Sequence, residues 1–487
     1  MSKPFLLFHA PIGTRSGYGD HSRDLCRILI EDDKYEVKIA DLRWGGTPRN
    51  ALTENPDHKI FIDKILKGEE LKRVPDLHIQ LTVPSEFQFL GRYNIGITAG
   101  IETTMASAHW IKGLNMMNLN IVPSVHARNV FQNTNWTRKN PQGQIEEEIK
   151  LRKPIEVLFE GVKTDIFKRT NVLPQSVVNE MKNVKDSFNF LFVGHWLKGD
   201  MGQDRKDVGM LIKVFLETFK NVKNPPGLIL KTSGATFSKL DRREIMAKVN
   251  AIKRTVTGTE LPNVYLIHGQ LTDEEMNSLY NHPKVKAHIT FTKGEGFGRP
   301  LLEASISAKP IIASGWSGHL DFLPRELVLL LPGQLTNVHP SAAWDTVLLK
   351  EAKWFTPNYN YASQVMRDVF EHYKKYLPNA AKLAAINEVQ FSFERMKKEF
   401  LALLDNYVPK FATQFSVNLP GLPATPTLNK MDQSKEITLP KLKRLDEVKE
   451  ESAGSSIGSK EEKELIKDAP ELSATETGEA TEQTKEK

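Results

Sequence analysis

Short apolar runs alternate with amphipathic stretches from residue 5 to about residue 410 of this chain of 487 residues. Each run has the length of a buried strand, and strands that alternate with helices are typical of a parallel sheet covered on both faces. The runs predict a first series of strands over 5–11, 35–42, 77–83, 93–100, 119–124 and 155–161. They predict a second series over 188–194, 227–233, 264–269, 287–293, 310–316 and 327–333.

The amphipathic stretches between these runs predict helices, for example over 206–220 and 271–282. In the second of these, Thr272 is the expected N-cap and is followed by acidic residues that favour a first helical turn. Two series of similar length, divided near 165–187, predict an α/β protein with two doubly wound, Rossmann-like domains facing across a cleft. Ligands bind at the carboxyl ends of the strands in such sheets, so the cleft is the expected site.

Composition changes abruptly near the C-terminus. Residues 430–487 carry 11 basic and 15 acidic residues and no Phe, Trp or Tyr, which leaves 55 basic against 45 acidic residues for the rest. Such a tail cannot bury enough apolar area to offset the entropy of ordering it, so we expect it to be disordered. Prolines in 417–428 predict a linker before it. The stretch 439–451 is either a solvated tether or a docking peptide.

The other features of composition exclude several classes of protein. Hydrophobic residues make up 40% of the chain, which is ordinary for a globular protein and excludes collagen-like, fibrous and wholly disordered chains. No apolar run approaches the ~18 residues of a membrane helix, and the N-terminus lacks the pattern of a signal peptide. Cys26 is the single cysteine, so no internal disulfide and no cysteine-based zinc site can form. These features predict a cytoplasmic protein without a transmembrane segment.

The stretch 293–323 contains a glycine-rich turn with Gly294, Gly296 and Gly298 after a strand that we expect to end at Thr292. Pro300 follows at the expected first position of a short helix. Such a turn aims backbone N–H groups and a helix N-terminus into the cleft, where they could hold phosphate.

Two carboxylates, Glu295 and Glu303, flank this turn. Carboxylates would repel phosphate, but they accept hydrogen bonds well from the hydroxyls of ribose and sugars. Taken alone, the glycine-rich turn favours the plainer explanation, a turn with a surface Glu and a helical Glu that have no function.

The segment "EGFGRPLLEASISAKPIIAS" (295–314) resembles the signature of two Glu separated by seven residues in retaining GT-B glycosyltransferases, chiefly family four. Five other segments resemble that family in the same order: 16–25, 121–131, 159–167, 190–215 and 390–408. The resemblance covers about residues 5–408. It implies an N-terminal acceptor-side domain (1–170), a nucleotide-sugar-binding domain (171–375) and helices that cross back to the first domain (376–410). The linker and tail expected from composition (411–487) lie outside the resemblance.

The resemblance also implies roles for individual residues. Glu303 would accept hydrogen bonds from the donor ribose, and Glu295 would contact hydroxyls of the transferred sugar. Arg205 and Lys206 would neutralise the diphosphate, because a guanidinium and a lysine stabilise a leaving diphosphate without metal. The backbone amides around Phe297 and Gly298 would help orient the sugar and the phosphate, and Gly296 and Leu302 complete the expected substrate-binding residues. Many family members carry an arginine where this chain has His195, which leaves open whether His195 or Lys198 supplies that contact.

The first half of the chain is less informative. Gly17 and Gly19 would bring the backbone close to the donor phosphates or the acceptor, with a helix beginning near Asp20, although a plain turn and helix cap explain them equally well. Glu102 and His109 lie in a segment that resembles the acceptor side of related enzymes. Glu102 is a candidate substrate contact and His109 a candidate catalytic residue, although a lone histidine is more often structural. At the end of a strand in the second half, Lys231 is a further candidate for contact with the cleft.

These features together predict a hexosyltransferase-type enzyme that moves a sugar from a UDP- or GDP-linked donor to a hydroxyl acceptor. The resemblance implies retention of the anomeric configuration. No Asp-x-Asp follows a strand, so we expect no metal site and no cofactor. The acceptor stays open among a glycan, a lipid-linked glycan, a protein and modified DNA of the kind that phage enzymes glucosylate, as does peripheral membrane contact. The alternative is a catalytically inactive, glycosyltransferase-like binding protein that acts through its tail.

Overall fold

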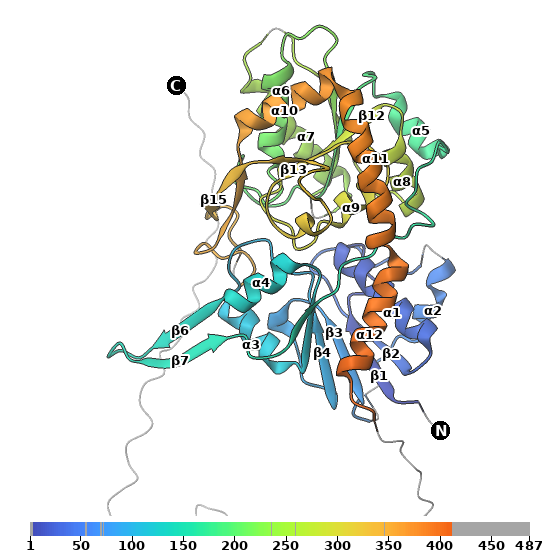
Figure 1. The fold of residues 1–487 in the computed structure, drawn as a ribbon, viewed down its shortest axis with the longest axis vertical. Coiled ribbons are helices and arrows are strands. Elements are labelled where there is room, and N and C mark those ends of the chain that lie inside the picture. The colour runs from blue at the N-terminus through green and yellow to red at the C-terminus, as the bar shows by residue number, and fades with distance from the viewer. Residues whose placement is uncertain are drawn as a thin grey trace, which may run out of the picture. The chain divides into compact units, whose positions relative to one another are not determined.

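The computed structural model describes residues 3–411, except 54–55, 69–70, 72, 235, 259 and 345. The predicted linker and charged tail lie outside the described residues from position 412 onward. Within the described part, two six-stranded sheets form the framework of the molecule (Figure 1). Both sheets are parallel throughout, as the near-continuous apolar runs predict.

The first sheet has the strand order β2-β1-β3-β4-β5-β8. Its strands are β1 (Phe5–Ala10), β2 (Glu36–Asp41), β3 (Leu77–Leu81), β4 (Tyr93–Ile97), β5 (Leu119–Val122) and β8 (Ile155–Val157). The helices between them are α1 (Gly17–Asp32), α2 (Lys59–Ile62), α3 (Ala108–Met116) and α4 (Val125–Asn133), with 3-10 turns η1 (Pro56–His58) and η2 (Pro84–Glu86).

The second sheet has the strand order β11-β10-β9-β12-β13-β14. Its strands are β9 (Asn189–Val193), β10 (Gly227–Lys231), β11 (Val264–Ile267), β12 (Val285–Ile289), β13 (Ile311–Ser314) and β14 (Leu329–Leu331). Its helices are α5 (Gln175–Lys182), α6 (Val208–Phe219), α7 (Lys239–Arg254), α8 (Asp273–Asn281), α9 (Arg299–Ser305) and α10 (Tyr359–Glu371), with the 3-10 turn η3 (Gly318–Asp321). All twelve predicted strands are therefore confirmed.

Local signals set several helix ends as expected. Thr272 caps α8 through a reciprocal capping box with Glu275. Gly298, at φ +97°, is the N-cap of α9, and Pro300 is the second residue of that helix rather than the first, still within the turn where proline is tolerated. Two expected boundaries are wrong: β12 ends at Ile289 rather than Thr292, and α1 begins at Gly17 rather than near Asp20, because the Ser16 side chain accepts a hydrogen bond from the backbone N–H of Gly19 and caps the helix earlier.

Two antiparallel hairpins were not predicted. They are β6 (Asn135–Lys139) with β7 (Ile145–Lys150), and β15 (Gly333–Asn337) with β16 (Lys353–Pro357). Figure 1 shows the β6–β7 hairpin projecting away from the strands of the first sheet. Most of its side chains are exposed, so its sequence lacks the buried apolar face that reveals a strand.

The last two helices are α11 (Tyr373–Gln390) and α12 (Phe393–Tyr407). Figure 1 shows α12 beside α1, and Lys397 of α12 forms an ion pair with Glu31 of α1 over 2.8 Å. Met396, Phe400 and Leu404 of α12 belong to the same apolar core as Leu6 and Phe8 of β1. The C-terminal helix thus crosses back from the second sheet to the first, as the resemblance implies.

Candidate functional site

The glycine-rich turn of 294–298 packs directly against the loop that follows β4. A Cβ on Gly294 would lie 1.9 Å from the carbonyl oxygen of Glu102, and one on Gly296 would lie 2.0 Å from that of Ala99. No side chain fits at either distance, so these two glycines are required by the close approach of the two backbones. The turn therefore joins the carboxyl ends of β12 and β4, one from each sheet, where the sequence predicts the cleft.

Polar contacts reinforce the same junction. Ser124, the N-cap of α4, donates a hydrogen bond from its Oγ to the carbonyl oxygen of Gly296 over 2.6 Å. The backbone N–H of Val125 donates to Asp321 Oδ2 over 2.8 Å. Phe297 and Leu302, which were expected to bind the sugar donor, are 3% and 0% exposed and belong to the apolar core. Their side chains therefore anchor the turn in the core.

Glu295 lies among the cations expected to neutralise a diphosphate. Its carboxylate forms an ion pair with Lys206, and its Oε2 lies 3.4 Å from Arg205 Nη1. Arg205 also donates to the carbonyl oxygen of Gly294 over 3.0 Å and lies 3.8 Å from Glu102 Oε1. Burial by itself raises the pKa of Glu295, but the charges of Lys206 and Arg205 lower it to about 2. The structure thus brings Glu102, Arg205, Lys206 and Glu295 into one cluster.

A buried network behind the loop holds Arg205 and Lys206 in place. Asp207, at φ +52°, pairs with Lys293 over 3.3 Å and accepts a hydrogen bond from the Tyr359 hydroxyl over 2.7 Å. The side chains of Lys293 and Asp207 are 1% and 0% exposed. Because the backbone N–H of Lys293 also donates to the carbonyl oxygen of Arg205, the strand-to-turn segment and the basic loop are fixed to one another.

Glu303 forms a second charged cluster, separate from that of Glu295. Its Oε1 accepts from Arg299 Nε over 3.0 Å and its Oε2 from the Tyr280 hydroxyl over 3.3 Å. Arg299 also donates to Asp24 Oδ2 of α1 over 2.9 Å, and Lys163 lies 2.9 Å from the other oxygen of Asp24. Burial raises the pKa of Glu303 to about 7, although Arg299 acts in the opposite direction. The sequence pattern does not single out Asp24, Lys163 or Arg299.

The other expected site residues are placed as follows. Gly17 and Gly19 lie in the first turn of α1, where a Cβ on Gly19 would meet the Thr14 carbonyl oxygen at 2.2 Å and one on Gly17 would meet nothing within 4 Å. His109 is exposed on α3 and takes no part in the hydrogen bonds and ion pairs found around Glu295 in the described part of the chain. Lys231 donates to the carbonyl oxygen of Gly269 over 2.6 Å, and burial lowers its pKa to about 8.

The two residues left open at the missing arginine differ in their surroundings. His195 is exposed, and its Nδ1 lies 3.2 Å from Ser233 Oγ. Its pKa is lowered by desolvation and by the nearby charges of Lys206 and Arg205. Lys198 is exposed and donates to the carbonyl oxygen of Ala343 over 3.3 Å. The charges of the basic pair thus act on His195.

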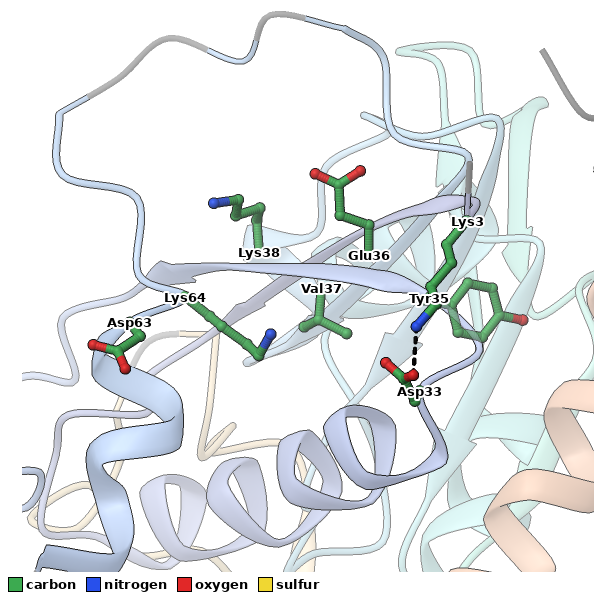
Figure 2. A pocket seen from close by; sticks show the side chains of 8 residues that line it. All are labelled: Lys3, Asp33, Tyr35, Glu36, Val37, Lys38, Asp63 and Lys64. Atoms are coloured by element: carbon green, nitrogen blue, oxygen red, sulfur yellow. Dashed lines mark ion pairs between the residues drawn. The ribbon is translucent and has the colours of Figure 1, made fainter. Parts of the chain in front are cut away.

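A hollow of about 300 Å³ lies elsewhere on the first sheet (Figure 2). It is lined by Lys3, Asp33, Tyr35, Glu36, Val37, Lys38, Asp63 and Lys64. Most of these residues are charged, and Figure 2 shows Glu36 and Lys38 on one face of β2 with Val37 on the other. Because β2 begins at Glu36, the hollow lies at the amino end of this strand, whereas the charged clusters lie at the carboxyl ends.

Comparison with solved structures identifies the fold. HepE from Anabaena, solved in complex with UDP-glucose, is 15% identical, with a TM-score of 0.54 over 82% of this chain and 99% of HepE. Sucrose-phosphate synthase from Thermosynechococcus elongatus is 13% identical, with a TM-score of 0.55 over 83% of this chain and 99% of the synthase. WaaG, a glycosyltransferase involved in lipopolysaccharide biosynthesis, is 13% identical, with a TM-score of 0.52 over 81% of this chain and 98% of WaaG.

These likenesses show that the chain has the GT-B fold of glycosyltransferases. The sequence matches no protein-family model and no curated protein. Among the described residues, no helix combines the length and apolar character needed to cross a bilayer.

Proposed function

We propose that the protein is a glycosyltransferase that moves a sugar from a nucleoside-diphosphate sugar to a hydroxyl acceptor. The observation that carries the proposal is the cluster of Glu295, Arg205 and Lys206 at the junction of the two sheets. Two fixed cations there can stabilise the charge that develops on a departing diphosphate. HepE, which shares the fold, was solved with UDP-glucose, so a UDP-linked sugar is the first donor to test.

The proposed donor site divides its work between the two carboxylates. Glu295 accepts hydrogen bonds from hydroxyls of the transferred sugar, and Glu303 accepts them from the ribose. Residues 1–170 supply the acceptor side and residues 171–375 the donor side. The acceptor class stays open, because no group of described residues selects one.

The proposed reaction proceeds with retention and without metal. The bond between the anomeric carbon and the diphosphate oxygen breaks, and the acceptor oxygen bonds to that carbon on the same face. The proton of the acceptor hydroxyl passes to the departing phosphate. Arg205 and Lys206 supply the positive charge that a metal ion supplies in other enzymes. Retention rests on the resemblance of the segment from Glu295 to Glu303 to retaining family-four enzymes.

Nucleotide binding tests the proposal directly. Thermal unfolding is measured with UDP, GDP, ADP and CMP and their sugars, for the wild type and for Glu303→Ala. A ligand at a hundred times its Kd adds about 2.7 kcal/mol to the free energy of unfolding and raises the midpoint of thermal unfolding by a few degrees. We expect one nucleoside diphosphate to stabilise the wild type but not the variant. Glu399→Ala is the control, because Glu399 forms a similar i,i+4 pair with Arg395 on exposed α12. A lack of response to every nucleotide would overturn the proposal.

A further inference from the structure

Arg299 binds two carboxylates on helices that pack against different sheets. Its Nε donates to Glu303 on its own helix α9, and its Nη1 donates to Asp24 on α1. The three side chains are largely buried, at 11% exposure for Arg299, 13% for Glu303 and 3% for Asp24. A single guanidinium therefore connects the carboxylate assigned to the donor ribose with a helix of the first sheet.

Asp24 is held firmly enough to serve as an anchor. Lys163 binds its second oxygen over 2.9 Å, so both oxygens of this carboxylate have a cationic partner. Burial opposes its ionisation, but Lys163 and Arg299 lower the pKa of Asp24 to about 2. Asp24 thus remains charged across the neutral range and fixes the position of the guanidinium.

The contacts of Glu303 leave it able to accept further hydrogen bonds. Arg299 occupies one lone pair of Oε1 and the Tyr280 hydroxyl occupies one of Oε2, and each carboxylate oxygen can accept two hydrogen bonds. Within the part of the chain that the structure describes, one position remains on each oxygen, which suits two adjacent hydroxyl donors. The protonated form would lose this capacity, and burial together with the neighbouring acids Asp273 and Asp20 favours that form.

We propose that Arg299 is a positioning residue for the donor, because it fixes the orientation of Glu303, the carboxylate assigned to the hydroxyls of the ribose. This inference rests on the proposed function. An arginine suits the task because its planar fork binds two carboxylates at once in fixed directions, which a lysine cannot do. Asp24 sets the orientation of the guanidinium. The position of Glu303 is therefore fixed relative to α1 of the first sheet.

The test compares two ligands that differ only in the ribose hydroxyls. Titration calorimetry measures Kd for UDP and for its 2′,3′-dideoxy analogue, and the same pair is made for GDP and ADP. We expect the wild type to prefer the ribonucleotide by about tenfold or more, because hydrogen bonds to charged groups discriminate strongly. Glu303→Gln and Arg299→Leu should both reduce this ratio towards one.

The ratio separates positioning from a structural role. A variant that only weakens the fold lowers the affinity for both ligands alike and leaves their ratio unchanged. Should Arg299→Leu fail to fold, Arg299→Lys and Asp24→Asn preserve charge or volume and still decide the question, since Arg299→Lys replaces the fork with a single ammonium and Asp24→Asn removes the charge of the carboxylate that anchors it. The matched control is Arg395→Leu, which removes an exposed i,i+4 pair with Glu399 on α12 and should retain the wild-type ratio.

Failure of the inference and failure of the proposed function look different. If the wild type binds no nucleoside diphosphate, the proposed function is wrong. If it binds one of them with equal affinity for the dideoxy form, or if Arg299→Lys and Asp24→Asn keep the full preference, nucleotide binding stands and the inference about Arg299 is wrong.

Discussion

Ser124 Oγ donates a hydrogen bond to the carbonyl oxygen of Gly296 over 2.6 Å and thereby joins the N-cap of α4 to the glycine-rich turn. Ser124 Oγ also accepts a hydrogen bond from the backbone N–H of Ala127 over 3.1 Å, so it both caps α4 and binds the turn. Ser124→Ala removes the cap and leaves a buried carbonyl without this partner. We expect the free energy of unfolding to fall by about 1–3 kcal/mol and nucleotide affinity to weaken.

Denaturant unfolding and calorimetry measure these two effects. Ser238→Ala is the matched control, because Ser238 caps α7 through the backbone N–H of Asp241 and does not contact the turn. It should lower stability without changing nucleotide affinity. Equal affinities in the wild type and Ser124→Ala would show that this hydrogen bond does not support the donor site.

Gly17 and Gly19 make a second matched pair on α1. A Cβ on Gly19 would lie 2.2 Å from the Thr14 carbonyl oxygen, whereas one on Gly17 has open space around it. We expect Gly19→Ala to destabilise the protein, and Gly17→Ala to be neutral or to stabilise it by up to about 1 kcal/mol, since alanine favours a helix. If Gly17 lies against a substrate, Gly17→Ala will lower activity while its unfolding midpoint stays unchanged. Unfolding midpoints and kcat/KM measured on both variants distinguish these cases.

The fold was predictable because buried parallel strands leave a strong signal. Runs such as "FLLFHA" in β1 and "NFLFV" in β9 are apolar almost throughout, since helices cover both faces of each sheet. The hairpin strands "NWTRK" and "IEEEIK" are mostly exposed and polar, so no period of hydrophobic residues distinguishes them from a loop. Strand and helix ends were less predictable, because caps such as that of Ser16 on α1 are formed by single side chains.

The grouping of residues in the candidate site was predictable only where local motifs indicated it. Glu295, Arg205 and Lys206 were expected in one donor site, and they do lie together. The direct pairing of Glu295 with both cations was not expected. The contact between Arg299 and Asp24 joins positions 275 residues apart, and neither residue type signals a partner at such a distance. Such contacts depend on how the two sheets pack, which the sequence pattern does not specify.

Chelation tests the metal-free chemistry. With Arg205 and Lys206 as the source of positive charge, release of nucleoside diphosphate from the sugar donor should proceed at the same rate in EDTA. Lys206→Met should lower kcat by roughly 10²–10³, the usual effect of removing one group that stabilises developing charge. Loss of activity in EDTA with rescue by Mn²⁺ would contradict the prediction, as would an unchanged rate in Lys206→Met.

Buried histidines and buried carboxyls should change the free energy of unfolding in opposite directions as the pH falls. Burial lowers the pKa of His21 and His78 to about 4 and that of His288 to about 3, so acid favours the unfolded chain, which protonates near pH 6.5. Burial raises the pKa of Glu160 and Glu303 to about 7, so in the folded protein these carboxyls take up protons at a higher pH than in the unfolded chain. Their contribution to the free energy of unfolding therefore increases as the pH falls from 7 to 4.5.

Thermal unfolding between pH 7 and 4.5 separates these contributions. His288→Gln should make the fall of the midpoint with acid shallower, because one group that resists protonation is gone. Glu303→Gln should make the fall steeper, because one opposing group is gone. The same slope in all three proteins would show that neither group titrates as stated.

The buried pair of Lys293 and Asp207 supports the basic loop, and its loss should be costly. Lys293→Met leaves the Asp207 carboxylate, which is 0% exposed, with the Tyr359 hydroxyl but without a cation. We expect a loss of roughly 3–5 kcal/mol in the free energy of unfolding, because one buried charge remains uncompensated. Adding Asp207→Asn to Lys293→Met should recover part of the loss by removing that charge. Lys220→Met, which breaks a partly exposed pair with Glu217, should cost no more than about 1 kcal/mol. Urea unfolding of the four proteins measures these differences, and a double variant less stable than Lys293→Met would show that the uncompensated charge is not the cause.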